Sequence, residues 1–204
     1  MGELYTIGHS TYPVKNIIQL LQHFNIHYVL DVRSMPYSKY APQYNKDTLS
    51  NTLKSNDITY AYMGKYFGAR QLDENYYPEG YLDFELFRGS ELFKSGLNNV
   101  QKGLEKYNIA LMCTEKNPFD CHRAIMVSRG FELVGINVQH ILHDFTSISQ
   151  EELNNQLLEC YFPDRGQITL FDNIEKTAEQ YLIDAYRERN KEIGYYLHGK
   201  KKGD

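Results

Sequence analysis

One stretch decides the fold of this chain: Ala110-Leu-Met-Cys-Thr-Glu-Lys-Asn-Pro-Phe-Asp-Cys-His-Arg-Ala124. An apolar run of the buried type ends at Cys113, and a turn that contains a proline separates it from residues 124–134, which are predicted to form a helix. A strand followed by a helix in this way is typical of an open α/β fold. Thiol, carboxylate, imidazole and guanidinium groups gather at the junction, which in such folds is the edge of the sheet where ligands bind.

The same alternation continues on both sides of this stretch. Short apolar strands are predicted at residues 4–7, 27–33, 58–63, 109–113 and 137–142, with helical segments between most of them. Strands that alternate with helices imply right-handed crossovers. We therefore predict an open, largely parallel, doubly wound α/β sheet of about five strands with flanking helices. Residues 64–89 show no sustained period and are predicted to form a long functional loop with fragments of helix.

Two parts are predicted along the chain. Residues 1–160 form the α/β domain, and residues 161–204 form a linker and a C-terminal helical tail. The linker is marked by proline, glycine and aspartate. The charged segment after it carries apolar residues at Ala178, Tyr181, Leu182 and Ala185, which predicts an amphipathic helix that docks on the domain.

Composition narrows the function classes. The chain has 204 residues and a net charge of -4, so no overall basic field attracts it to nucleic acid. Three cysteines do not suggest a disulfide framework, and no secretory signal precedes the first strand. No apolar run is long enough to span a bilayer. We expect a cytoplasmic protein with reduced thiols and no membrane partner.

Reactive side chains follow three of the predicted strands. The catalytic candidates are His9, Cys113, Glu115 and Cys121. The ligand-binding candidates are Ser10, Asp31, Arg33, Ser34, His122 and Arg123. Because the carboxyl ends of parallel strands meet at one edge of a sheet, these side chains are expected to converge there. The arginines predict an anionic small molecule or nucleic acid as the partner.

Each candidate also has a structural alternative. Asp31 and Arg33 could form an ion pair with no other role, and His9 could be a core histidine bonded to a carbonyl group. Cys113 could be a small buried apolar residue. Cys121, at the predicted helix start, is the thiol that a helix dipole would activate, whereas His122 would point elsewhere on that helix.

The cysteine spacing argues against familiar metal and redox motifs. Residues 114–120 separate Cys113 from Cys121, which matches neither a zinc knuckle nor the Cys-x-x-Cys redox motif. We therefore predict no cofactor. The alternative is a metal ion bound by the two thiolates, His122 and a remote histidine.

The combined motifs resemble a known family. Thr6-Ile-Gly-His-Ser10, Asp31-Val-Arg-Ser-Met-Pro36, Met112-Cys-Thr-Glu115 and Cys121-His-Arg123 are similar, in matching order, to the prokaryotic family called domain of unknown function 488. The likeness covers about residues 4–142, and the Cys-x-Glu … Cys-His-Arg element is specific to the family. The resemblance implies an α/β domain with a polar site built from these motifs, and it implies no particular reaction.

A second motif lies in the tail. Gln167-Ile-Thr-Leu-Phe171 resembles the short peptide by which bacterial DNA polymerases and repair proteins dock on the sliding clamp. Leu170 and Phe171 would fill an apolar pocket, while Gln167 would make polar contacts at its rim. Alternatively, the apolar residues of this segment anchor the terminal helix to the domain. The bacterial sliding clamp is therefore a predicted partner.

Three functions are consistent with these residues. The first is an enzyme, a hydrolase or transferase, that acts on a nucleotide or nucleic acid and is recruited to DNA replication or repair through the tail. Arg33 and Arg123 would hold its phosphate. Glu115 or His9 would serve as acid and base, and one of the two thiols as nucleophile. The second is a non-catalytic ligand-binding or adaptor module, and the third is a metalloprotein.

Overall fold

The computed structural model describes residues 2–165 and 176–197. Gln167, Leu170 and Phe171 of the clamp-like peptide lie outside the described residues. Binding to a sliding clamp therefore stays a prediction from the sequence.

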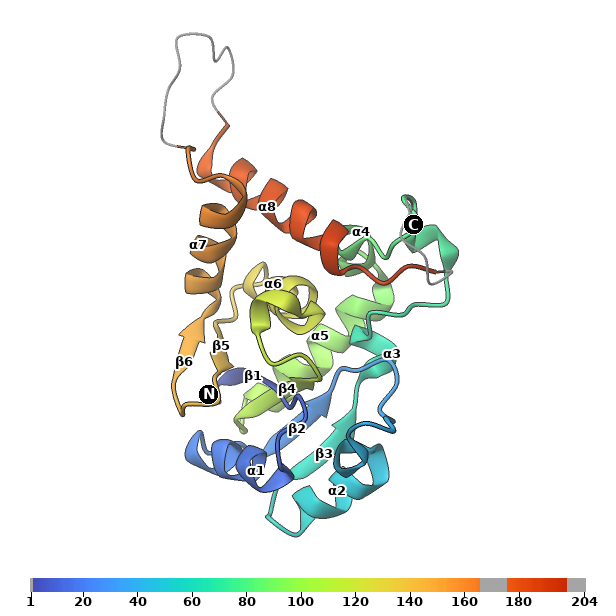
Figure 1. The fold of residues 1–204 in the computed structure, drawn as a ribbon, viewed down its shortest axis with the longest axis vertical. Helices are drawn as coiled ribbons and strands as arrows, with labels where there is room; N and C mark the ends of the chain where they lie inside the picture. Colours follow the sequence, from blue (N-terminus) through green and yellow to red (C-terminus); the bar gives the residue numbers. More distant parts are fainter. Residues whose placement is uncertain (1, 166–175, 198–204) are drawn as a thin grey trace.

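The described residues build a six-stranded sheet in the order β3-β2-β4-β1-β5-β6 (Figure 1). The strands are β1 (Leu4–Gly8), β2 (Tyr28–Asp31), β3 (Thr59–Tyr62), β4 (Ile109–Cys113), β5 (Val138–Ile141) and β6 (Ser147–Ser149). Strands β1 to β5 pair in parallel, and β6 pairs antiparallel with β5. The predicted α/β sheet is confirmed, with one strand more than expected.

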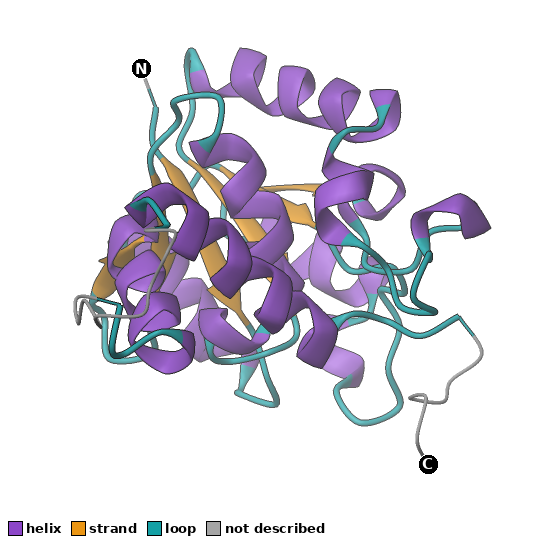
Figure 2. Cartoon of the chain, turned by 90° about the horizontal axis from the view of Figure 1, so that it is seen from above, coloured by secondary structure: helices purple, strands orange, loops and turns teal. Residues whose placement is uncertain are grey.

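Helices cover both faces of this sheet, and the strands lie between them (Figures 1 and 2). One face packs against α1 (Val14–His23) and α2 (Lys46–Lys54). The other packs against α5 (Glu91–Leu104), a π-helix (Arg123–Ser128) and α6 (Arg129–Glu132). The predicted loop at 64–89 contains the short helices α3 (Gly64–Phe67) and α4 (Phe84–Arg88) and a 3₁₀ turn (Glu74–Tyr76). It is a loop with fragments of helix, as predicted.

The connections after β1 and β4 leave the sheet on opposite faces. The connection after β1 runs through α1 on one face of the sheet, whereas the connection after β4 runs through the π-helix and α6 on the other face. In open α/β sheets, ligands bind at the carboxyl edge beside strands whose connections leave on opposite faces.

The C-terminal helices pack onto the same layer as α4 and α6. Helix α7 (Gln150–Tyr161) begins with a capping box at Ser149, and α8 (Ala178–Ile193) begins with one at Thr177. Helix α8 lies against α7 and extends across to α4 (Figure 1). Its Asn190 side chain bonds the backbone of Phe84 and Leu82, which fixes the far end of the predicted C-terminal helix. Within the described ranges, no helix combines the length and apolar character needed to cross a membrane.

Candidate functional site

The loops after β1 and β4 meet at the carboxyl edge of the sheet and continue the pairing of their strands. The His9 amide donates to the Cys113 carbonyl at 2.9 Å, and the Ser10 amide donates to the Thr114 carbonyl at 2.7 Å. Ser10 then takes a left-handed backbone conformation, with φ of 46°, which turns the chain toward α1. The strand-end residues predicted to converge therefore do lie at one edge of the sheet.

Two thiols, a carboxylate and an imidazole form a compact group there. One ligand atom each from Cys113, Glu115, Cys121 and His122 lies within 4.8 Å of the others. The Glu115 Oε2 atom is 3.0 Å from the Cys113 Sγ atom and 2.9 Å from the Cys121 Sγ atom. Glu115 is exposed as a residue, but this oxygen lies between two buried thiols. We call these four residues the cysteine cluster.

His122 belongs to this group for a local reason that the sequence did not show. Cys121 has extended backbone angles, with φ of -130° and ψ of 134°, and so lies before the helix. The side chains of Cys121 and His122 can therefore both reach the cluster. The expectation that His122 points elsewhere on a helix is wrong.

The orientation of the His122 ring is fixed by the backbone. Its Nε2 atom lies 3.2 Å from the Val32 carbonyl oxygen, which only accepts, so Nε2 carries a proton and donates it. The Nδ1 atom is then the one that faces the cluster, 3.6 Å from the Cys113 Sγ atom. Histidines that bind metals are held in the same way, by a hydrogen bond from the other ring nitrogen.

The two thiols of the cluster have opposite pKa shifts. Burial opposes ionisation of Cys121, but its hydrogen bond with Cys113 and the charges of Arg123 and His122 outweigh burial and hold its pKa well below the usual range. Burial and the neighbouring Cys121 raise the pKa of Cys113. Burial, followed by the charge of Cys121, also raises the pKa of Glu115. Cys121 is therefore the thiol that ionises first.

Asp31 and Arg33 form a buried ion pair beside the cluster. The Arg33 Nε atom donates to Asp31 Oδ1 at 2.9 Å, and Nη2 donates to Oδ2 at 2.6 Å and to the Tyr44 carbonyl at 2.8 Å. The Tyr60 hydroxyl also donates to Asp31. These contacts fix the direction of the guanidinium, whose Nη1 atom lies 3.1 Å from the His9 Nε2 atom.

His9 is committed to this network through both ring nitrogens. Because a guanidinium only donates, His9 Nε2 accepts from Arg33, and Nδ1 carries the proton that it donates to the Ser10 carbonyl at 2.6 Å. Burial, and then the charge of Arg33, lower the pKa of His9 to about 4. The ring also stacks on Tyr44. A neutral histidine held in this way favours a positioning role over acid–base chemistry.

Arg123 holds the loop that carries Glu115. Its fully buried guanidinium donates to the carbonyl groups of Glu115 and Lys116 and to the Thr6 hydroxyl. Gly8 makes this arrangement possible, because a Cβ atom there would lie 1.8 Å from the Glu115 carbonyl oxygen. Arg123 therefore holds the loop that carries Glu115 in place, and it does not line the cavity over the site.

Comparison with protein families gives one match. The family described as domain of unknown function DUF488 matches residues 13–129, which is more than half of the chain. The chain belongs to the DUF488 family. Neither the curated proteins nor the solved structures contain a match. The matched region holds the whole cysteine cluster together with Asp31, Arg33 and Ser34, whereas His9 and Ser10 precede it.

A cavity of about 620 Å³ opens over the cysteine cluster of this DUF488 domain. Its wall includes Arg33 and Ser34 on one side and Tyr195 and Tyr196, just after α8, on another. The Ser34 hydroxyl makes a hydrogen bond within the protein, because its Oγ atom accepts from the Arg70 amide at 2.8 Å. The chain after α8 thus completes a site whose other walls come from the sheet edge.

Arg70 is a site residue that the sequence did not reveal. It lies in the long loop before α4, stacks over the Tyr195 ring at 4.5 Å, and lines both this cavity and an adjoining one of about 550 Å³. Arg70 forms no ion pair with a carboxylate of the described residues. No periodic pattern or motif surrounds it, so only the three-dimensional structure brings it to the site. The adjoining cavity is also lined by the exposed rings of Tyr37 and Tyr40.

Proposed function

We propose that this DUF488 protein is a metal-dependent enzyme of the hydrolase type. Cys113, Cys121 and His122 would hold a Zn²⁺ ion, and Glu115 would transfer protons beside it. The observation that carries the proposal is the convergence of these four ligand atoms within 4.8 Å, with the His122 Nδ1 atom turned inward by the Val32 carbonyl. Thiolate and imidazole are the ligands that Zn²⁺ prefers.

The surroundings favour a catalytic over a structural zinc site. Structural sites are closed by four protein ligands, whereas catalytic sites use three and keep a position open. The cluster lies at the floor of a cavity, and Glu115 is exposed as a residue. A zinc ion with an open position lowers the pKa of a coordinated water to about 7. Glu115, whose carboxylate reaches both thiols, is then placed to accept a proton.

The order of the residues supports this assignment by analogy. Zinc deaminases hold the ion with one histidine or cysteine and two further cysteines, and a glutamate two positions after the first ligand acts as acid and base. Cys113 and Glu115 have the same spacing. The analogy concerns the chemistry and not the fold. The analogy favours a reaction in which water, rather than a cysteine thiolate, attacks the substrate.

The substrate that suits the cavity is anionic. Arg33 and Arg70 line it, and Arg70 is the cation whose guanidinium is not paired with a described carboxylate. The rings of Tyr37 and Tyr40 in the adjoining cavity offer surfaces on which a base could stack. A nucleotide or a nucleic-acid strand combines both features, and we propose this substrate class.

Metal binding tests the proposal directly. We expect purified protein to hold about one Zn²⁺ per chain and to bind Co²⁺ with the absorbance of cobalt–thiolate bonds. Outer-shell substitutions in metal sites cost about 10–100-fold in affinity, so Cys113→Ser, Cys121→Ser and His122→Gln should each cost at least about 100-fold. Elemental analysis measures the zinc content, and Co²⁺ titration measures the metal affinity of each variant. Cys160→Ser, at an exposed thiol outside the cluster, is the matched control and should bind as the wild type does.

Glu115→Gln separates an enzyme from a binding module. We expect this variant to keep the metal and to lose turnover of nucleotides or oligonucleotides, followed by chromatography of the products. Saturable substrate binding without product in the zinc-loaded wild type would favour a non-catalytic module. Equal Co²⁺ affinity in the wild type and all three ligand variants would refute the metal site.

A further inference from the structure

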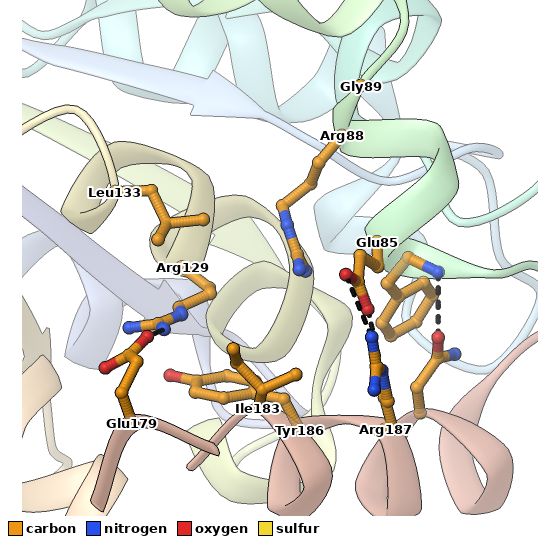
Figure 3. A pocket seen from close by; sticks show the side chains of 11 residues that line it. Glu85, Arg88, Gly89, Arg129, Leu133, Glu179, Ile183, Tyr186 and Arg187 are labelled. Carbon is orange, nitrogen blue, oxygen red and sulfur yellow. Dashed lines mark hydrogen bonds and ion pairs between the residues drawn. The ribbon is translucent and has the colours of Figure 1, made fainter. Parts of the chain in front are cut away.

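A second cavity, apart from the cysteine cluster, lies between α4, α6 and α8 (Figure 3). Its volume of about 330 Å³ is at the lower end of the range for small-molecule sites, about 300–1,000 Å³. Phe84, Leu133, Ile183 and the ring of Tyr186 give it apolar walls. Leu133 at its rim is exposed, so the cavity opens to solvent.

Charged side chains also line the cavity, and all but one of its arginines are paired. Figure 3 shows the Arg187–Glu85 and Arg129–Glu179 pairs, at 2.8 and 2.9 Å, on opposite sides of the space. Arg129 also bonds Glu132 and lies over the Tyr186 ring. These charges are neutralised within the protein and need no ligand.

Arg88 is the exception. It extends from α4 into the space between the two ion pairs (Figure 3). Among the described residues no carboxylate forms an ion pair with it, and its hydrogen bond to the Ile125 carbonyl is long, at 3.5 Å. Burial, and then the charge of Arg129, lower the pKa of Arg88 to about 10. The group stays protonated at neutral pH, so a cation that has no ion-pair partner among the described residues extends into the cavity.

We propose that the cavity between α4, α6 and α8 binds a small carboxylate with an apolar body, and that Arg88 holds the carboxylate. A guanidinium matches a carboxylate with two parallel hydrogen bonds. The single unpaired cation fits a singly charged ligand, and the apolar walls fit its hydrocarbon part. A phosphate would bring more charge than Arg88 alone can neutralise.

Benzoate and benzamide are suitable probes, because they share a shape and differ in charge. We expect the full-length wild type to bind benzoate saturably and to bind benzamide about ten- to a hundred-fold more weakly, as a lost charge-assisted hydrogen bond implies. Methyl NMR signals of Leu133 and Ile183 should shift on titration. The methyl signal of Met35, which lines the cavity over the cysteine cluster, should not shift.

Arg88→Met should weaken benzoate binding by the same factor and leave the midpoint of thermal unfolding unchanged or higher, because it removes an unpaired, half-buried charge. Lys191→Met removes an equal charge from α8 outside the cavity and should keep benzoate affinity. Three results would overturn the proposal: no saturable benzoate binding, equal binding of benzamide, or undiminished benzoate binding by Arg88→Met. Each of these readouts is independent of metal binding and turnover, so failure here leaves the proposed function intact.

Discussion

His140 is a buried histidine whose hydrogen bonds define its tautomer. The His140 Nε2 atom lies 2.8 Å from Gln150 Oε1, which only accepts, so Nε2 carries the proton and donates it. The Nδ1 atom is then an acceptor, and the Thr6 hydroxyl, which accepts from Arg123, donates to it at 2.8 Å. Burial, and then the charge of Arg123, lower the pKa of His140 to about 3. The folded protein therefore requires this ring to be neutral.

This requirement predicts a loss of stability in mild acid. The folded-state pKa of about 3 lies below the value of 6.5 in an unstructured chain. Between these values the unfolded chain binds more protons, so the free energy of unfolding falls as pH falls. From pH 7 to pH 5 the contribution of His140 is roughly 2 kcal/mol. Urea denaturation of the wild type and His140→Gln at both pH values measures it.

Carboxylates add to the pH dependence of both proteins, so the informative quantity is the difference between them. We expect His140→Gln, whose amide offers both a donor group and an acceptor but cannot take up a proton, to be less stable at pH 7 but to lose less stability on acidification. Parallel pH profiles for the two proteins would contradict the assignment of a neutral buried ring.

At the scale of elements, the site depends on how closely β1 approaches the loop after β4. Gly8 ends β1, and the Glu115 carbonyl group occupies the space where a side chain would begin. Arg123 donates a hydrogen bond to the same carbonyl oxygen. The position of Glu115 in the cysteine cluster therefore follows from the packing of two strand ends.

Gly8→Ala is expected to destabilise the fold by about 3 kcal/mol, because backbone atoms block the new methyl group and overpacking forces the strand ends apart. It should also weaken Co²⁺ binding by displacing the ligand Cys113, which pairs with Gly8 across the sheet. The free energy of unfolding and a Co²⁺ titration report the two effects.

Gly103→Ala in α5 is the control. The nearest atom to its new Cβ is the flexible Ile109 Cδ1 atom at 2.9 Å. The gain in helix propensity is about 1 kcal/mol, so we expect a change in stability near zero and unaltered Co²⁺ affinity. If both variants lose similar amounts of stability and Co²⁺ affinity, the close approach of the Glu115 carbonyl group to Gly8 is not the cause of these losses.

The elements that the sequence predicted well are those with a buried apolar pattern. The β4 run before Cys113 could be assigned because burial on both faces gives an uninterrupted apolar run. The Ile17, Ile18, Leu21 face of α1 could be assigned because burial on one face imposes the helical period. Strand β6 could not, because Ser147–Ser149 holds a single apolar residue and forms only by pairing with β5. The π-helix after Cys121 also leaves no periodic signal of its own.

The site residues also divide into those that the sequence could place and those that it could not. Cys113, Glu115 and Cys121 could be placed together because strand ends converge and the family motif joins them. The role of His122 depends on one extended residue, Cys121, and the role of Arg70 on a loop without a period. Both features arise from tertiary packing, which local sequence does not encode.

At the scale of the whole molecule, a chain of buried hydrogen bonds connects the sheet edge to α8. It continues from His140 through Gln150, whose Nε2 atom donates to the Tyr186 hydroxyl at 2.6 Å. Tyr186 in turn donates to Asn154 on α7, and Asn154 donates to Glu132 on α6. Every link has a donor and an acceptor, so the chain ties three helices to the strand that supports the site.

Tyr186→Phe tests whether this chain holds α8 in place. The substitution leaves the Gln150 donor and the Asn154 acceptor without their partner in a buried region, which costs about 2 kcal/mol. Because α8 leads into Tyr195 and Tyr196 at the wall of the cavity over the cysteine cluster, we expect faster amide hydrogen exchange in α7, α8 and this wall. Exchange in β1 and β4 should stay as in the wild type.

Tyr181→Phe is the control. It removes a hydroxyl from the same helix that makes no hydrogen bond to the described residues, and its effect on the free energy of unfolding should stay within about 0.5 kcal/mol. If the two variants unfold at the same urea concentration, the buried chain does not fasten α8, and the ion pairs at its surface must do so instead.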